Sequence, residues 1–251
     1  MNAITASSWP YPRWIAHRGA GKLAPENTLA AFRLGAQHGY RMFECDAKLS
    51  ADGVPFLLHD ATLERTTNGR GTGGDLPLGA LARLDAGSWH SRAYAGEAVP
   101  TLEALARFCI ANGYFLNIEI KPTPGQEETT GRVVGETAAR LWQGQAVPPL
   151  FSSFKPDALA GAQATAAHIP RALLLDTLWD GCLDTARRLG CVAIVCNHAL
   201  WDAALVAQVK GMGMRTLSYT VNDDWAAQRL IALGTDGIIT DRVDLFSPAT
   251  P

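Results

Sequence analysis

The sequence of 251 residues lacks several features that mark whole classes of protein. No uninterrupted apolar run is long enough to cross a bilayer, so we expect no membrane insertion. The first residues lack a basic segment followed by an apolar one, so we expect no signal peptide. The formal net charge is only -2, which gives no electrostatic reason to expect nucleic acid or an anionic membrane as a partner.

Cysteine is scarce, and its spacing fits neither disulfides nor zinc. The five cysteines are odd in number and lie mostly in apolar runs: Cys45, Cys109, Cys182, Cys191 and Cys196. We therefore expect reduced core residues in a cytoplasmic protein. Apolar residues make up 47% of the chain, which is enough for a large core. At this length we expect one domain spanning residues 1–251.

Short β-rich runs alternate with helical windows along the whole chain. The sequence predicts strands at 13–18, 41–46, 54–60, 114–121, 148–154, 171–176, 191–197, 214–222 and 236–241. It predicts helices at 25–39, 101–113, 127–143, 156–167, 179–189, 200–211 and 224–233. This alternation is typical of an α/β protein with a parallel sheet, and seven or eight repeats favour a (β/α)8 TIM barrel.

One predicted strand is surplus to an eight-stranded barrel. Asp52-Gly53 is typical of a two-residue hairpin turn, which would make 54–60 antiparallel to the strand before it. Removing this strand leaves eight, and residues 47–98 become a small insertion, or cap, between the second strand and the second helix. The stretch "TTNGRGTGGDLPLG" within it is rich in turn residues, in agreement with this interpretation.

Polar side chains follow the first three barrel strands, at the end where TIM barrels place their active sites. In chain order they are His17 and Arg18, then Glu44 and Asp46, then Glu119 and Lys121. A two-residue turn would also place His59 opposite Asp46 and so over the same mouth, although a bulge would change this register.

This set of side chains predicts cleavage of a phosphoester. The three carboxylates are hard oxygen ligands suited to one divalent cation, Mg²⁺ or Ca²⁺. Arg18 and Lys121 suit a phosphate oxyanion, and two histidines can divide general base and general acid duty. Structural alternatives are that Lys121 only pairs with Glu119 and that His59 only bonds Asp60.

Other polar residues near the mouth are expected to serve the structure or the substrate. Asn27 is expected to start the first helix, and Asp241 to cap a short helix after the last strand. Trp89 and His90, in the insertion, are candidates for lining the alcohol side of the site.

Six segments resemble, in order, the signature blocks of the glycerophosphodiester phosphodiesterase family. They are AHRGAGKLAPENTLAAF, FECDAKLSADGVPFLLHDATLERTTNG, NIEIKP, FSSF, SYTVND and DGIITDR. The resemblance runs from about residue 14 to 243 and is closest to the short cytosolic bacterial enzymes.

The resemblance implies a barrel like that of phosphatidylinositol-specific phospholipase C. It also implies hydrolysis of small glycerophosphodiesters, such as glycerophosphocholine and glycerophosphoethanolamine, to sn-glycerol 3-phosphate and an alcohol. By position, the metal ligands are Glu44, Asp46 and Glu119, the acid–base pair is His17 and His59, and the phosphate-binding cations are Arg18 and Lys121. Tyr219 stands where the family commonly has Trp, and we expect its flat face to contact substrate.

Several alternatives stay open at this stage. The attacking group is either the glycerol 2-hydroxyl, which gives a cyclic phosphate, or a metal-activated water. His17 is preferred as the first base and His59 as the acid. A lyase that releases the cyclic phosphate and a non-catalytic binder of phospholipid headgroups are the alternative functions. The sequence does not choose between Mg²⁺ and Ca²⁺, among headgroups, or between a monomer and a homodimer.

Overall fold

A computed structural model describes residues 9–248 of the chain. The first eight residues, on which the expected absence of a signal peptide partly rests, lie outside the described part. Nine strands form one sheet: β1 (Trp14–Ala16), β2 (Met42–Leu49), β3 (Pro55–Leu57), β4 (Phe115–Ile120), β5 (Leu150–Ser153), β6 (Arg171–Leu175), β7 (Ala193–Asn197), β8 (Arg215–Tyr219) and β9 (Gly237–Thr240).

The sheet closes on itself. Neighbouring strands follow the order β1-β9-β8-β7-β6-β5-β4-β2, and β1 also pairs with β2. These pairings are all parallel, whereas β3 runs antiparallel along the outer edge of β2. The predicted TIM barrel is therefore confirmed, and the hairpin strand lies outside it, as expected.

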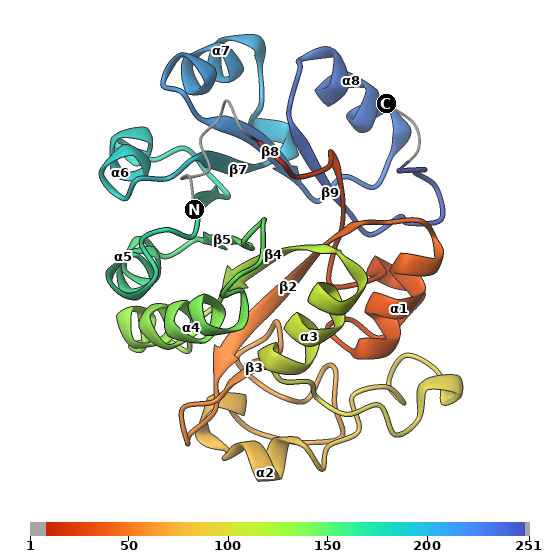
Figure 1. Cartoon of the computed structure of the whole chain (residues 1–251). Helices are drawn as coiled ribbons and strands as arrows, with labels where there is room; N and C mark the ends of the chain where they lie inside the picture. The colour runs from red at the N-terminus through yellow and green to blue at the C-terminus, as the bar shows by residue number, and fades with distance from the viewer. Residues whose placement is uncertain (1–8, 249–251) are drawn as a thin grey trace.

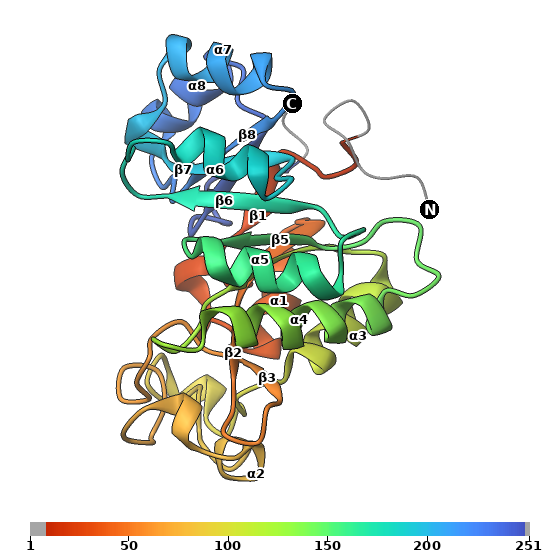
Figure 2. The ribbon, with the colours of Figure 1, turned by 90° about the vertical axis from the view of Figure 1, so that its left-hand side faces the viewer.

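Helices follow the barrel strands and cover the outside of the barrel (Figure 1). They are α1 (Leu29–Gln37), α2 (Leu78–Leu81), α3 (Leu102–Asn112), α4 (Glu127–Leu141), α5 (Pro156–Thr165), α6 (Cys182–Arg188), α7 (Ala203–Gly211) and α8 (Asp224–Ala232). In Figure 2, α4, α5 and α6 lie in front of the strands that they cover. All seven predicted helical windows contain a helix, and among the α-helices of residues 9–248 only the short α2 was not predicted.

The core has two layers because each barrel strand is buried on both faces. Ile15, Leu174 and Val195 belong to a cluster inside the barrel. Phe32 and Ile118 belong to a second cluster between the strands and the helices. All five cysteines are buried and none is bonded to another, which confirms the expectation that they are core residues. Among residues 9–248, no helix is both long enough and apolar enough to span a membrane.

The hairpin register differs from the sequence prediction by one residue. Leu49 pairs with Pro55, and the Leu58 amide donates to the Asp46 carbonyl. The turn contains three residues and not two, with Gly53 at a φ of +77°. The predicted pairing of His59 with Asp46 is therefore wrong, because Leu58 takes that position and the strand has already ended at Leu57.

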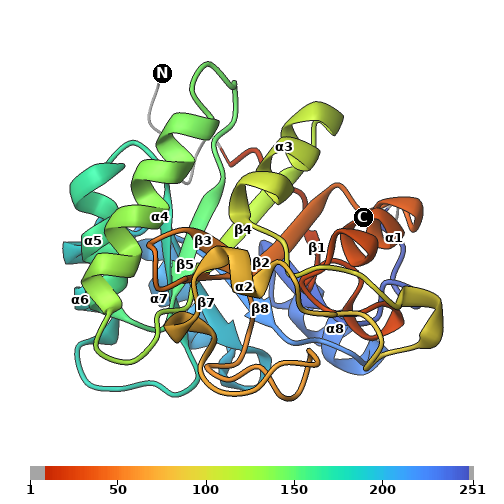
Figure 3. The same ribbon diagram turned by 90° about the horizontal axis from the view of Figure 1, so that it is seen from below.

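The segment between β2 and α3 has an apolar cluster of its own. It is built from residues such as Phe56, Leu63 and Leu81. Figure 1 shows this segment, with α2, at the lower end of the molecule, and Figure 3 shows it from below, nearest the viewer.

Helix α1 packs closely against the turn that follows β1. Gly35 in α1 lies against the backbone of Gly19, and a Cβ at position 35 would overlap the Gly19 carbonyl oxygen. Gly35→Ala is therefore expected to lower the free energy of unfolding by about 2 kcal/mol. Thermal denaturation should show a fall in Tm of roughly 5 °C.

Gly211→Ala is the matched control for this change. Position 211 lies in α7 with open space around it, so alanine there should be neutral or slightly stabilising. Equal melting temperatures for the two variants would contradict the packing argument.

Candidate active site

Three carboxylates meet at the C-terminal end of the barrel strands. Glu44 and Asp46 lie two residues apart on β2, so both point to the same face, and Asp46 is in register with Glu119 on β4. One oxygen from each carboxylate lies within 4.8 Å of the others, and all three side chains are buried. Barrel closure therefore brings together ligand atoms from residues up to 75 positions apart in the chain.

Two cations flank this acidic triad of Glu44, Asp46 and Glu119. Arg18 Nε lies 3.2 Å from Asp46 Oδ2. Lys121 Nζ lies 3.1 Å from Glu119 Oε1 and 3.4 Å from Asp46 Oδ1. Lys121 therefore does pair with Glu119, which the sequence left as a structural alternative. The same ammonium group also pairs with Asp46 on β2.

The surrounding charges shift the pKa values of the three carboxylates in different directions. Burial alone would raise the pKa of Asp46, but Arg18, Lys121 and His59 together hold it well below its usual range. Burial raises the pKa of Glu44, and the neighbouring carboxylates add to the rise. Burial and Asp46 likewise raise the pKa of Glu119. The three carboxylates therefore resist being ionised together unless more positive charge is supplied.

Oxygens of the triad that lack a hydrogen-bond donor fit a metal ion. Glu44 Oε1 is buried and has no donor among the described residues, and the buried Asp46 Oδ1 has only the ion pair with Lys121 at 3.4 Å. Buried carboxylate oxygens without a donor are costly, and a hard divalent cation is the partner that three such groups suit. The described residues thus fit one divalent cation at this position.

His17 is held in place by a carboxylate from the opposite end of the chain. Its Nδ1 lies 2.7 Å from Asp241 Oδ1, and its Nε2 lies 3.7 Å from Glu44 Oε2. Asn222 donates to the other oxygen of Asp241. Burial alone would raise the pKa of Asp241, but the hydrogen bond and charge of His17, the hydrogen bond from Asn222 and the charge of Arg18 together lower it to about 2. The expectation that Asp241 caps a helix is wrong, because its carboxylate orients His17 instead.

His59 has a carboxylate partner of its own. Its Nδ1 lies 2.6 Å from Asp60 Oδ1, and Arg65 Nε donates to Asp60 Oδ2. Arg65 also pairs with Glu26, which in turn pairs with Arg18. Burial lowers the pKa of His59, and Arg18 and Lys121 contribute to the decrease. The contact between His59 and Asp60 agrees with the structural alternative, yet His59 also lies within electrostatic reach of Asp46.

Asn27 has a role at the site that sequence analysis did not predict. Its Nδ2 donates to Asp46 Oδ2 over 2.8 Å, and its Oδ1 accepts from the Asp46 amide. Asn27 adopts a φ of +60°, in the left-handed region that asparagine tolerates better than most residues. Thr28, not Asn27, caps α1, so the helix-start expectation for Asn27 is wrong.

Tyr219 lies at the rim rather than at the triad. Its hydroxyl donates to the Leu175 carbonyl oxygen, and its ring packs edge-on against Phe154. The Phe154 ring also lies 6.0 Å from Lys121 Nζ. The structure therefore groups His17, His59, Arg18 and Lys121 around the triad, whereas Tyr219 contacts Leu175, Asp176 and Phe154.

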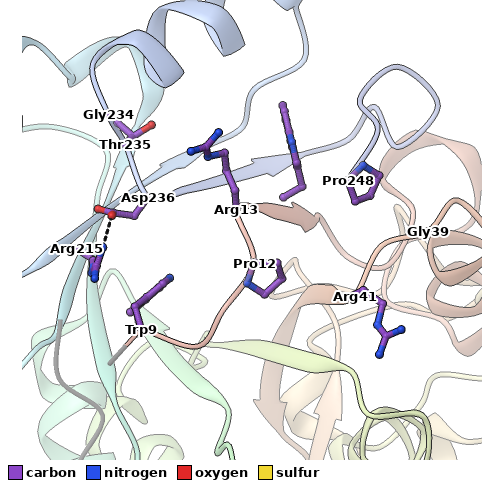
Figure 4. Close-up of a pocket in the computed structure, with 11 residues that line it drawn as sticks. Trp9, Pro12, Arg13, Gly39, Arg41, Arg215, Gly234, Thr235, Asp236 and Pro248 are labelled. Atoms are coloured by element: carbon purple, nitrogen blue, oxygen red, sulfur yellow. Dashed lines mark hydrogen bonds and ion pairs between the residues drawn. The ribbon is translucent and has the colours of Figure 1, made fainter. Parts of the chain in front are cut away.

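Two cavities help to locate the site. A cavity of about 400 Å³ reaches the triad region and is lined by residues that include His17 and Arg18. A second cavity of about 590 Å³ lies at the opposite end of the barrel, where Arg13 and Arg41 precede β1 and β2 (Figure 4). Figure 4 shows Arg215 paired with Asp236 on one wall of this second cavity. His17, Arg18 and Asp241 line the first cavity and not this one, so the first cavity is the one adjacent to the candidate site.

A TIM barrel with a buried acidic triad, two carboxylate-bound histidines and two flanking cations defines a class of barrel hydrolases that act on phosphoesters. Comparison with known proteins makes this more specific. The model of the glycerophosphoryl diester phosphodiesterase family matches residues 17–245, and the chain belongs to that family. The resemblance inferred from the sequence blocks is thereby confirmed.

Individual relatives align with this chain over nearly its full length. A glycerophosphodiester phosphodiesterase of Caldanaerobacter subterraneus is 33% identical over 233 residues, which cover 90% of this chain and 93% of the relative. A solved phosphodiesterase of Oleispira antarctica, in complex with the product sn-glycerol-3-phosphate, has a TM-score of 0.87 and 35% identity. That match covers 95% of this chain and 96% of the other. A glycerophosphodiester phosphodiesterase of Agrobacterium tumefaciens has a TM-score of 0.75 and 29% identity, over 94% and 99% of the two chains.

Removing one carboxylate of the triad should weaken metal binding and, at the same time, raise the stability of the metal-free protein. Glu119→Gln removes a negative charge that burial and Asp46 oppose, so the metal-free variant should melt at a higher temperature than the wild type. The same change should weaken Mg²⁺ binding by at least about tenfold. Calorimetric titration with Mg²⁺ and melting curves in EDTA measure the two effects.

The pH dependence of the metal-free protein follows from the same raised pKa values. A carboxyl whose pKa is higher in the folded state stabilises the fold below the ordinary carboxyl range and loses this effect as pH rises through the raised pKa. The wild type in EDTA should therefore lose stability towards neutral pH more steeply than Glu119→Gln. Glu136→Gln, on the exposed face of α4, is the control and should change neither measurement. A Glu119→Gln protein that binds Mg²⁺ as the wild type does would contradict the assignment.

Proposed function

We propose that this chain is a metal-dependent enzyme that hydrolyses glycerophosphodiesters to sn-glycerol 3-phosphate and an alcohol. The observation that carries the proposal is the buried triad, two of whose oxygens accept no hydrogen bond from the described residues, beside two histidines that each bond a carboxylate of their own. Family membership supports the reaction class, and the product bound to the Oleispira antarctica relative supports sn-glycerol 3-phosphate as the common product.

The proposed reaction uses the two histidines as a proton-transfer pair. One imidazole takes the proton of the attacking oxygen, which forms a bond to phosphorus. The other gives a proton to the departing alcohol oxygen as its bond to phosphorus breaks. Asp241 and Asp60 each bond Nδ1 of a histidine, which leaves Nε2 to face the substrate. The sequence-based preference for His17 as base and His59 as acid stays a prediction.

The cations stabilise charge on the phosphate. Glu44, Asp46 and Glu119 would hold Mg²⁺ or Ca²⁺, and such an ion would withdraw negative charge from the phosphoryl oxygens. Arg18 and Lys121 lie on the same side and supply hydrogen-bond donors for those oxygens. Tyr219 and Phe154 would provide apolar faces for the carbon skeleton of the substrate.

The identity of the attacking oxygen distinguishes this function from the alternative. If the glycerol 2-hydroxyl attacks, a cyclic phosphate forms and water opens it in a second step. A lyase would stop at the cyclic product, which ³¹P NMR would then show accumulating. No observation in the structure favours the lyase, so hydrolysis is the proposed outcome.

We also propose the context in which the enzyme works. The five unbridged cysteines favour a cytoplasmic location. The segment 47–98 acts as a cap within a single domain, and the protein works as a monomer or homodimer.

Metal removal is the first test of the function. Purified protein given glycerophosphocholine and Mg²⁺ should release sn-glycerol 3-phosphate, measured with a coupled dehydrogenase assay. EDTA should abolish the release, and excess Mg²⁺ or Ca²⁺ should restore it. Release that is unaffected by EDTA would rule out the metal-dependent mechanism.

Substitution of the histidines tests the acid–base assignment. His17→Ala and His59→Ala should each lower kcat by about 10² to 10⁴-fold with little change in melting temperature. Asp241→Asn should lower kcat as well, because it leaves His17 in place but removes the carboxylate that orients it. His38→Ala, on the exposed end of α1, serves as the control and should keep full activity. A His59→Ala enzyme with near-normal turnover would refute the assignment of His17 and His59 as the acid–base pair.

A further inference from the structure

The cavity beside His17 is bounded by both the barrel and the cap. Its barrel wall includes His17, Arg18 and Lys22, and its cap wall includes Trp89 and His90. The His90 Nε2 lies 3.0 Å from the carbonyl oxygen of Lys22, so the two walls are joined by a hydrogen bond. This cavity is called the headgroup pocket below.

Most charged groups around the headgroup pocket already have partners. Asp241 binds His17 and Asn222 through its two oxygens. Both oxygens of Glu26 accept from arginine. The two carboxylates therefore have little capacity left for a positively charged ligand.

Lys22 differs from these groups. Its side chain is exposed, and its ammonium makes no hydrogen bond or ion pair with any residue from 9 to 248. The other two lining cations are already neutralised by carboxylates, since Arg18 pairs with Glu26 and Asp46 and Arg65 pairs with Glu26 and Asp60. Lys22 is the free donor among them, and hydroxyl or anionic oxygens are the groups that it suits.

Trp89 supplies an apolar face on the opposite wall. The ring is 41% exposed, but its Nε1 donates to the Ala86 carbonyl oxygen and its edge packs on His90. The orientation of the ring is thus fixed before any ligand binds, so contact with it costs little conformational freedom. The C–H groups of a polyol, whether an open chain or a ring, can pack on such a face.

We propose that the headgroup pocket binds the alcohol half of the substrate and, through Lys22 and Trp89, selects hydroxylated, uncharged headgroups over cationic ones. The inference rests on the proposed function, since it concerns the second ester arm of the same diester. Glycerol and inositol headgroups have both hydroxyls for Lys22 and C–H faces for Trp89. The choline headgroup has no free hydroxyl and carries a positive charge, which the Trp89 face attracts and the unpaired ammonium of Lys22 repels.

The test compares headgroups on one enzyme. The full chain with Mg²⁺ is assayed for sn-glycerol 3-phosphate release from glycerophosphoglycerol, glycerophosphoinositol, glycerophosphocholine and glycerophosphoethanolamine. The wild type should have a higher kcat/KM for the first two substrates than for the last two. Lys22→Glu should lower this polyol-to-choline ratio by about tenfold, because it replaces repulsion of the cation with attraction.

Three further variants make the test specific. Arg33→Glu makes the same charge reversal on the exposed face of α1 and should leave the ratio unchanged. Trp89→Ala should lower kcat/KM most for the polyol substrates, and Trp89→Phe, which keeps a flat ring, should retain most of it.

Three results would count against the proposal in different ways. An unchanged ratio in Lys22→Glu would exclude Lys22 as the selecting group. An equal loss for every headgroup in Lys22→Glu and Trp89→Ala would instead place the common glycerol half in this pocket. No release from any of the four diesters by the wild type would reject the proposed function itself.

Discussion

Burial of three carboxylates at one point is the constraint on which the site depends. In a low-dielectric environment the repulsion among the three carboxylates is unfavourable, and the surrounding residues reduce it in separate ways. Arg18 and Lys121 supply positive charge, Asn27 donates to Asp46, and the pKa of Glu44 rises. Remaining negative charge and oxygens without a hydrogen-bond donor are what a divalent cation would satisfy.

The same constraint explains why the loop after β1 has an unusual backbone. Arg18 and Asn27 both have positive φ values, at +51° and +60°. This conformation lets the Arg18 amide donate to Glu44 while the Arg18 side chain reaches Asp46. Strain of this kind persists where surrounding contacts hold it, and the close contact of Gly35 with Gly19 is one of them.

Ion pairs also connect the cap to the barrel. Arg65 in the cap joins Asp60, the partner of His59, to Glu26, the partner of Arg18. This chain of charges connects His59 to Asp46 of the triad, whereas His17 lies next to the triad directly, with its Nε2 3.7 Å from Glu44. The family relationship accounts for the reaction class, whereas these contacts account for how this particular chain positions its groups.

Sequence alone determined the barrel, the extra hairpin strand and the collection of acidic, basic and histidine side chains at the mouth. These follow from local periodicity and from the rule that parallel strands end at one edge, and neither needs long-range information. Only the tertiary structure decided the hairpin register, which a three-residue turn shifted by one position. It alone paired Asn27 with Asp46 and His17 with Asp241, the latter across 224 residues. Barrel closure sets such contacts, because it brings the first and last strands side by side, and no local pattern records it.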